Sequence, residues 1–293
     1  MLTRQKAVLY LLQGALRPLS PIEFVKLVFL LRRETVLEKD PSFYDFVPYK
    51  YGPFSFSLYR ELDSLRQYGY VTSEKDRISL CNRNLELTKE KTRELPAKVR
   101  NAVEFILGRY GKLEQDALVR SVYRRYPWFA LNSELPERRL ASVKRPKKAS
   151  LAVYTAGYEG RSVDAFFNDL MQRGLRAVVD VRSNPISRKY GFGGARFAEL
   201  CNKVGFQYHH LPSLGIPSTA RAGLGSFDSY QLLLTQYEQV MLPERSTDLE
   251  EVGTLMLQQP SVLVCFERDA SFCHRSRLAG AVANAIGLDV VHL

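Results

Sequence analysis

The sequence is poor in cysteine, with four in 293 residues, and no two of them form a Cys-x-x-Cys pair. A disulfide-dense secreted scaffold is therefore excluded. No signal peptide is recognisable, so we expect a soluble protein in a reducing cytoplasm. The most apolar early run, residues 21–31, is interrupted by Glu23 and Lys26 and is too short to span a bilayer. Low-complexity tracts and internal repeats are also lacking, and the 45% hydrophobic composition excludes disordered and collagen-like classes.

Acidic residues are in the minority, and the imbalance is confined to one half of the chain. The whole sequence has 42 Lys and Arg against 31 Asp and Glu, a net charge of +11. Residues 1–150 hold 29 basic against 17 acidic residues, whereas residues 151–293 hold 13 against 14. We therefore expect an anionic partner for the first half, namely nucleic acid, with DNA favoured over RNA, and no membrane partner.

The first half is predicted to be a mainly helical, winged-helix-like domain over residues 1–133. Apolar spacing predicts a helix in residues 3–16, a second after the Ser20-Pro21 cap, and a third after Ser55 or Ser57. In residues 70–80, apolar and polar side chains alternate on both sides of a polar turn, and this pattern indicates a hairpin. This order is typical of a winged helix, and helices near 96–110 and 112–126 follow. Aromatic residues of this half could stack on bases or form the core: Phe43, Tyr44, Phe46, Tyr49, Tyr51 and Phe54.

Residues 134–150 form a basic segment with two prolines and no apolar period. Such a segment is either an anion-binding strap or a solvated linker. We interpret it as the boundary between two domains, because a chain of this length suggests two.

The second half, residues 151–293, alternates short β-branched runs with helical patterns. Strands are expected around LAVYTAGY, RAVVDVRS, FQYHHL, SVLVCFER and DVVHL, with helices over 162–173, 195–204, 229–241, 246–258 and 274–286. This alternation predicts an α/β fold, in which helices cover both faces of a mostly parallel sheet.

Three of the loops that follow predicted strands each combine a carboxylate with arginines. Because ligands collect at the carboxyl ends of parallel strands, we expect Glu159, Asp180 and Glu267 to meet in one pocket. The arginines that accompany them are Arg161, Arg182, Arg188, Arg268 and Arg275. They bind an anionic ligand or, alternatively, form a structural salt-bridge network.

A helix is predicted to start at the sequence Cys273-His274-Arg275. The helix dipole would favour a bound anion there and lower the pKa of the thiol. No general base is paired with Cys273 in the sequence, so a packing role is the favoured alternative to a nucleophile.

Three blocks of the second half resemble the domain-of-unknown-function-488 family: TAGYEGRSVDAFFNDL, VVDVRSNPISRKYGF and VLVCFERDASFCHRSRLAGAVA. The resemblance implies a Rossmann-like domain whose pocket is lined by Tyr158, Glu159, Asp180, Arg182, Pro185, Arg188, Glu267, Cys273, His274 and Arg275. It implies no substrate. The motifs KLVFLL and FVPYKYGPFSFSLYREL of the first half resemble a small helical domain of phage- and toxin–antitoxin-associated proteins.

Neither a metal nor a cofactor is expected from the sequence. Cys265, Cys273 and His274, with His209 or His210, could in principle hold zinc, but they have no standard ligand spacing. GFGGAR at residues 191–196 is neither a phosphate-binding loop nor a dinucleotide fingerprint.

Two hypotheses of function remain. In the first, a basic helical domain grips nucleic acid and an α/β hydrolase acts on a nucleotide or modified base, for instance by cleaving its N-glycosidic bond. The catalytic candidates are Glu159, Asp180, Glu267 and His274, and the substrate-binding candidates are Tyr158, Arg182, Asn184, Arg188, Arg268, Cys273 and Arg275. Of these, Asp180 should stay ionised, and Glu159 should transfer a proton near neutral pH. In the second hypothesis the protein is a non-catalytic regulator or defence sensor.

Overall fold

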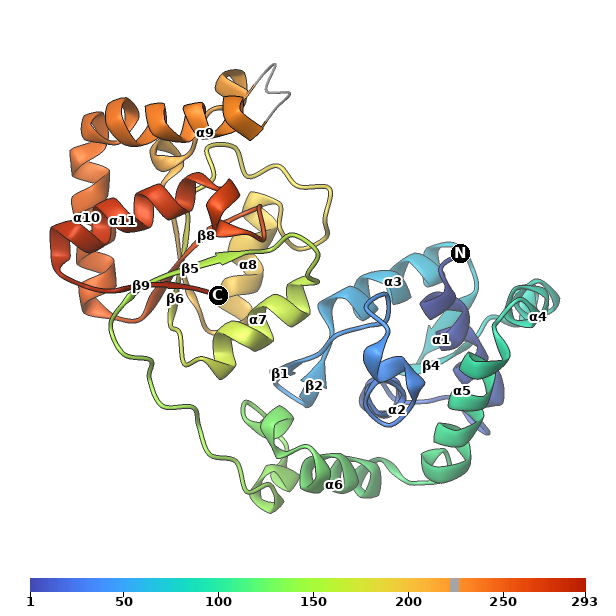
Figure 1. Ribbon diagram of the computed structural model, residues 1–293. Helices are drawn as coiled ribbons and strands as arrows, with labels where there is room; N and C mark the ends of the chain where they lie inside the picture. The colour runs from blue at the N-terminus through green and yellow to red at the C-terminus, as the bar shows by residue number, and fades with distance from the viewer. Residues whose placement is uncertain (222–226) are drawn as a thin grey trace. The chain divides into compact units, whose positions relative to one another are not determined.

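The computed structural model describes residues 1–221 and 227–293. The chain divides into two compact units, Met1–Arg145 and Pro146–Leu293, drawn in blue to green and in green to red in Figure 1. Each unit has its own hydrophobic core. No helix among the described residues is long and apolar enough to cross a membrane.

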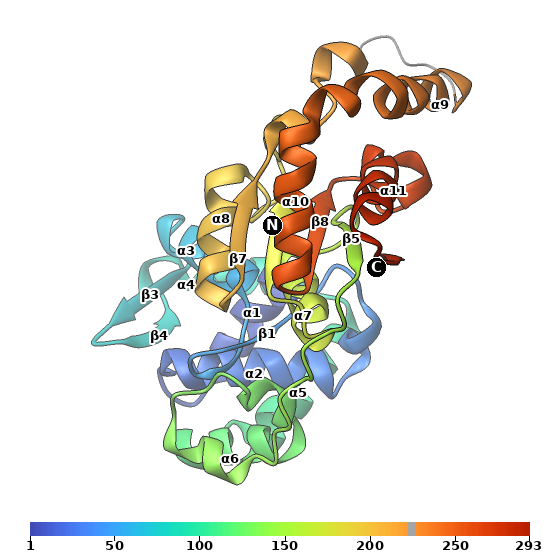
Figure 2. The ribbon, with the colours of Figure 1, turned by 90° about the vertical axis from the view of Figure 1, so that its left-hand side faces the viewer.

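The N-terminal unit is largely helical and contains two short antiparallel hairpins. Its first part contains α1 (Thr3–Gly14), α2 (Pro21–Arg33), β1 (Val47–Tyr49), β2 (Gly52–Phe54), α3 (Phe56–Gln67), β3 (Val71–Glu74) and β4 (Arg77–Leu80). Leu19, between α1 and α2, forms an isolated antiparallel β-bridge with Ile78 of β4, which joins this loop to the hairpin. The β3–β4 hairpin turns at Lys75 and Asp76, both with positive φ, and projects beyond the neighbouring helices (Figure 2).

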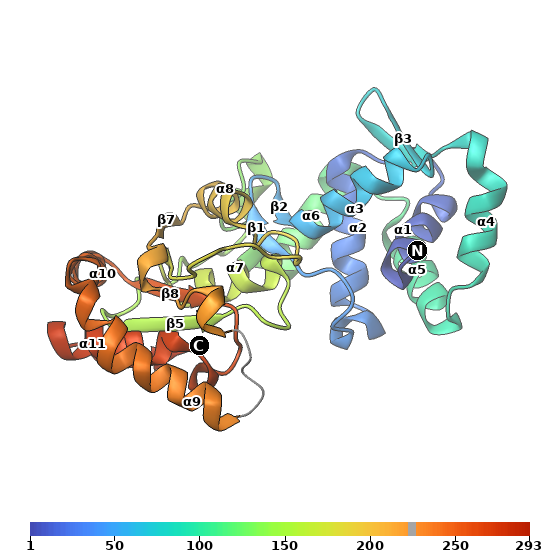
Figure 3. The same cartoon turned by 90° about the horizontal axis from the view of Figure 1, so that it is seen from above.

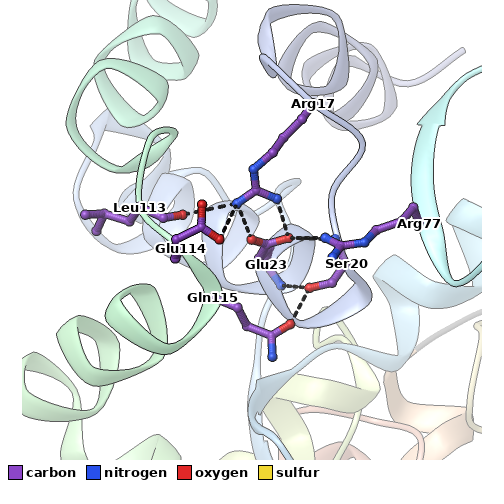
Figure 4. Close-up of polar contacts among 7 residues, drawn as sticks. All are labelled: Arg17, Ser20, Glu23, Arg77, Leu113, Glu114 and Gln115. Carbon is purple, nitrogen blue, oxygen red and sulfur yellow. Dashed lines mark hydrogen bonds and ion pairs between the residues drawn. The ribbon is translucent and has the colours of Figure 1, made fainter.

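Glu23 fixes the hairpin to the start of α2 (Figure 4). The side chain of Ser20 accepts from the Glu23 amide and Glu23 accepts from the Ser20 amide, which is the capping box that the Ser20-Pro21 sequence favours. The carboxylate of Glu23 also accepts hydrogen bonds from Arg17 at 2.6 Å and from Arg77 of β4 at 3.2 Å. One buried carboxylate therefore joins the α1–α2 loop, α2 and the hairpin.

Three further helices complete this unit: α4 (Leu85–Arg93), α5 (Ala97–Tyr110) and α6 (Gln115–Arg125). Of these, α4 was not foreseen. Phe43, Tyr44 and Phe46 are buried in the core, whereas the side chain of Tyr51 is 51% exposed. The aromatic segment thus serves mainly the core, with β1 and β2 forming a small hairpin from it.

The segment expected to be a linker begins inside the N-terminal unit. Residues Pro136–Leu140 form a 3₁₀ turn. Beside this turn, Leu135, Ala141 and Val143 pack against the N-terminal core. The division at Arg145 therefore leaves only a short basic stretch before the second unit.

The C-terminal unit is an α/β domain with a five-stranded parallel sheet in the order β7-β6-β8-β5-β9. The strands are β5 (Val153–Gly157), β6 (Ala177–Asp180), β7 (Gln207–His210), β8 (Ser261–Cys265) and β9 (Val290–His292). Every residue of β5, β6 and β8 is buried, because these central strands are covered on both faces. The fold class expected from the sequence is confirmed.

Helices cover both faces of this sheet. The helices are α7 (Val163–Gln172), α8 (Gly194–Val204), α9 (Phe227–Gln236), α10 (Ser246–Gln258) and α11 (His274–Ile286). Figure 3 shows α7 and α8 on one face and α10 and α11 on the other. On the second face, Val179 and Leu263 pack with Met256 of α10 and Leu278 of α11. A π-helical turn, Tyr237–Met241, continues α9.

Candidate functional site

The three loops that the sequence singled out follow the three central strands of the sheet. β8 lies between β6 and β5, and the register pairs Asp180 with Val264 and Gly157 with Cys265. The carboxyl ends of these strands therefore meet at one edge, as expected. This adjacency depends on the insertion of β8 between two earlier strands, which the order along the chain does not reveal.

Gly157 allows two of these loops to come into direct contact. A Cβ atom at this position would lie 1.8 Å from the carbonyl oxygen of Glu267. Beyond the strand, the amide of Glu159 donates to the carbonyl of Phe266 at 2.9 Å. The carboxylate of Glu159 accepts from the amide of Arg268 at 3.0 Å. Glu159 and Arg268 are both predicted site residues, and these bonds hold them together at the edge where the strands end. The side chain of Glu159 is exposed there.

Asp180 and Arg182 form a buried ion pair at the end of β6. Nε and Nη2 of Arg182 donate to the two carboxylate oxygens of Asp180, at 2.7 and 2.5 Å. Tyr208 donates its hydroxyl to the same carboxylate at 2.9 Å. Burial alone would lower the pKa of Arg182, but the hydrogen bonds and charge of Asp180 outweigh burial and raise that pKa. Arg182 is thereby fixed in its charged form.

The third nitrogen of the Arg182 guanidinium, Nη1, connects the loop after β5 to the loop after β6 through two hydrogen bonds. Nη1 donates to the hydroxyl of Tyr158 at 2.9 Å and to the carbonyl of Phe192 at 2.7 Å. The ring of Tyr158 stacks on that of Phe192, with centroids 4.0 Å apart. Arg182 therefore positions Tyr158 within the site.

Arg275 is also turned toward the protein. Its side chain is buried, and its two terminal nitrogens donate to the carbonyls of Glu267 and Arg268. These bonds fix the loop after β8 from the first turn of α11. Its Nε atom is buried and has no hydrogen-bond partner among the described residues.

A pocket of about 310 Å³ opens between these loops. It is lined by Tyr158, Arg182, Ser183, Asn184, Ile186, Ser187, Arg188, Ile216, Ser218, Cys265 and Phe266. The predicted residues Tyr158, Arg182, Asn184 and Arg188 line it. The other predicted residues lie outside this lining, within the described part of the chain: Glu159, Asp180, Pro185, Glu267, Arg268, Cys273, His274 and Arg275.

Comparison with known proteins matches residues 162–282 to the family described as domain of unknown function DUF488. The C-terminal unit contains a DUF488 domain. The match starts at Ser162, directly after the TAGYEGR sequence. No curated protein and no solved structure matches the chain. The resemblance proposed for the N-terminal half finds no support in these comparisons.

Beside the pocket, the DUF488 domain holds a cluster of two thiols, an imidazole and a carboxylate. Sγ of Cys265 lies 3.2 Å from Oε2 of Glu267, and Nδ1 of His274 lies 3.9 Å from the sulfur atoms of Cys265 and of Cys273. The ring of Tyr237, from the π-helical turn, packs edge-on against the ring of His274, and the two ring centroids are 5.4 Å apart. The sequence analysis considered Cys265, Cys273 and His274 together as a zinc set and set them aside for lack of standard spacing; the structure brings these three together without His209 or His210.

The thiols of this cluster differ in acidity. Burial would raise the pKa of Cys273, but the hydrogen bonds with Cys265 and His274 and the charges of His274 and Arg275 lower it overall. The hydrogen bond with Cys273, together with burial, raises the pKa of Cys265. Burial, followed by the charge of Cys273, raises the pKa of Glu267.

Several residues of the DUF488 site were missed by the sequence analysis. Ser183 and Ser187 lie within the recognised DVRSNPISR sequence, and Phe266 lies within CFER. These motifs offered a signal for them. Ile216 and Ser218 come from the segment after β7, and Tyr208 from β7 itself. No sequence pattern marks these three.

Proposed function

We propose that the DUF488 domain binds a single nucleotide or modified base in the pocket at the ends of β5, β6 and β8. The observation that carries this proposal is the lining: the exposed aromatic ring of Phe266 shares a small cavity with the exposed Arg188. Tyr158 also lines the cavity, but its ring is buried and already stacked on Phe192. An aromatic ring stacks on a base, and an arginine fork binds phosphate. Asn184 adds an amide that can read the edge of a base.

The size of the pocket limits the ligand to one unit of a nucleic acid. A volume of about 310 Å³ lies at the lower end of the range for small-molecule sites, roughly 300–1,000 Å³. A base that belongs to a polymer would have to leave its stack to enter. The proposal therefore covers free nucleotides and flipped or single-stranded ones.

The reaction that we propose is hydrolysis of the N-glycosidic bond. Its transition state carries positive charge on the sugar, which a carboxylate stabilises. Asp180 is unsuited to this task because Arg182 and Tyr208 occupy its oxygens. Glu159 lies outside the lining but directly follows the lining residue Tyr158, is exposed, and is held through one oxygen by the amide of Arg268; it is the carboxylate assigned here.

The N-terminal unit is proposed to bind the nucleic acid, with DNA preferred. Its element order is that of a winged helix, and the excess positive charge lies in the same half of the chain. The exposed Lys75 stands at the turn of the β3–β4 hairpin, where such folds meet the phosphate backbone.

A second candidate is recognition without catalysis, in a regulator or sensor. The hydrogen bonds to Asp180 favour this second candidate. Both carboxylate oxygens of Asp180 accept from Arg182 and Tyr208, so this carboxylate stabilises the structure and is not available for chemistry. Both candidates share the same ligand class and differ only in turnover.

One experiment separates them. Full-length protein is incubated with nucleotides and with oligonucleotides that contain modified bases, and mass spectrometry detects any released base. Release that Glu159→Gln abolishes, with binding retained, supports the hydrolase. Binding without release supports the sensor, and neither binding nor release overturns both.

The variants compare an arginine that lines the pocket with one that lies away from it. Arg188→Ala should weaken binding of the ligand at least tenfold, whereas Arg173→Ala, on the surface of α7, should not change it. For the N-terminal unit, Lys75→Ala should reduce the slope of log affinity for duplex DNA against log salt by about one. An unchanged slope would contradict a role for the hairpin.

A further inference from the structure

We propose that Cys265, Cys273 and His274 bind one zinc ion beside the pocket of the DUF488 domain. Their ligand atoms, two Sγ and one Nδ1, all lie within 4.8 Å of one another, and all three side chains are buried. Two thiolates and an imidazole are ligands that Zn²⁺ prefers, and Cys₂His sets occur in zinc enzymes. This inference does not depend on the proposed nucleotide ligand.

The distances fit a tetrahedral site with little rearrangement. Zinc bonds of about 2.3 Å to sulfur and 2.0–2.1 Å to nitrogen place the sulfur and nitrogen of adjacent ligands about 3.6 Å apart. Here both sulfur-to-Nδ1 distances are 3.9 Å. Closing them takes a few tenths of an ångström, which side-chain rotation can supply.

A hydrogen bond at Nε2 of His274 fixes the orientation of the ring so that its other nitrogen can bind a metal. Its Nε2 atom lies 3.1 Å from the carbonyl oxygen of Val181. Since a carbonyl only accepts, Nε2 carries a hydrogen, so the nitrogen that faces the two sulfur atoms and is left to bind a metal is Nδ1. A backbone carbonyl on the second ring nitrogen is the usual support of a metal-bound histidine.

The topology explains why the spacing of these residues gave no signal. Cys265 ends β8, whereas Cys273 and His274 cap and begin α11 after a 3₁₀ turn. The loop between them returns the chain to the end of the same strand. Eight positions therefore separate two thiols that the fold brings together.

The carboxylate of Glu267 lies beside this set of ligands and is not one of its members. Its Oε2 atom lies 3.2 Å from Sγ of Cys265, and Cys265 also lines the pocket. We assign the fourth position to water or to a molecule bound in the pocket, with Glu267 as the carboxylate next to it. The ion would then lie at the wall of the pocket and within reach of a molecule bound there.

The test measures metal directly. Full-length protein is purified under reducing conditions, given Zn²⁺ alone, dialysed, and analysed by elemental mass spectrometry; Co²⁺ is then substituted and its absorption recorded. We expect about one zinc per chain, together with the strong near-ultraviolet absorption of Co²⁺–thiolate bonds. A zinc content equal to that of Cys273→Ser would overturn the proposal.

Variants identify the ligands and guard against misfolding. Cys265→Ser, Cys273→Ser and His274→Gln should each weaken zinc binding at least 100-fold, and Glu267→Gln about tenfold. Cys201→Ser is the matched control, because this thiol is equally buried but lies in α8. If a serine variant fails to fold, the folded wild type still decides: wild-type protein that retains no zinc after dialysis overturns the proposal. Thiolate absorption by Co²⁺ at wild-type strength in Cys273→Ser would overturn the assignment of Cys273.

Discussion

Asp180 and Arg182, two positions apart in the sequence, form a two-point ion pair in which both side chains are buried. The pair ends β6, holds Tyr158 through a further hydrogen bond, and accepts Tyr208 from the edge strand β7. Residues from β7 and from the segments that follow β5 and β6 thus depend on one carboxylate and one guanidinium. The pair shapes the pocket wall while leaving Asp180 itself outside the lining.

Replacing Asp180 by Asn should destabilise the protein far more than it changes chemistry. The substitution leaves the charge of Arg182 buried without its partner, and breaking such a pair costs about 3–5 kcal/mol. Urea unfolding of the variant measures this loss. Asp169→Asn, whose partners Arg161 and Arg173 are partly exposed, should cost about 1 kcal/mol or less. Equal stability of Asp180→Asn and wild type would contradict a structural role for the pair.

Arg188 and Arg275 should respond differently to the same change. Arg188→Lys alters an exposed side chain at the pocket, so it should weaken binding of a phosphate-bearing ligand and leave the unfolding midpoint unchanged. Arg275→Lys removes a donor from two backbone carbonyls that hold a loop, so it should lower stability by about 1–3 kcal/mol. Calorimetry and thermal unfolding of both variants check this. Loss of ligand binding in Arg275→Lys at unchanged stability would instead make Arg275 a ligand-binding residue.

Lys26 should make the stability of the protein depend on pH. Its side chain is 1% exposed and donates to the carbonyl of Tyr51, and burial lowers its pKa to about 7. The unfolded chain keeps the usual pKa of 10.5, so between pH 7 and 10.5 it binds the proton that the folded protein has lost. Stability should therefore rise over this range, by an amount on the order of 4 kcal/mol, and be lowest below pH 7.

The variant Lys26→Met isolates this effect. It should lack the rise between pH 7 and 10.5 that denaturant unfolding detects in the wild type. Lys50→Met, at a side chain that is 55% exposed, is the control and should follow the wild-type profile. If the stability of Lys26→Met rises between pH 7 and 10.5 as much as that of the wild type, the rise comes from other titratable groups.

The sequence predicts the elements well because their signals are local. The capping box of Ser20 and the cap of Ser55 mark helix starts, and alternation around Lys75 and Asp76 marks the hairpin. The convergence of three loops also follows from the sequence, since parallel strands end at one edge. Helix α4 was missed because it is short and has few apolar residues.

The roles of individual side chains were not predictable in the same way. Arg182 and Arg275 were both predicted to bind the ligand, yet one binds a carboxylate and the other binds two backbone carbonyls. The difference depends on where the loop after β8 passes, which is a property of the folded chain. The contact of Cys265 with His274 has the same origin, and no spacing rule includes it.

Gly157→Ala should disrupt the site although it adds only one methyl group. The new Cβ atom would lie 1.8 Å from the carbonyl oxygen of Glu267, a backbone atom that cannot rotate away, so the loop after β8 must move. That loop leads into α11 and is bound by Arg275, so its displacement should lower stability by about 2 kcal/mol or more and weaken ligand binding. Gly280→Ala is the control within the same unit, because nothing lies within 4 Å of its Cβ position in α11, and alanine there should raise stability by up to about 1 kcal/mol. Thermal unfolding of the two variants beside the wild type measures both effects. Gly157→Ala with wild-type stability and binding would show that the loops do not need this close contact.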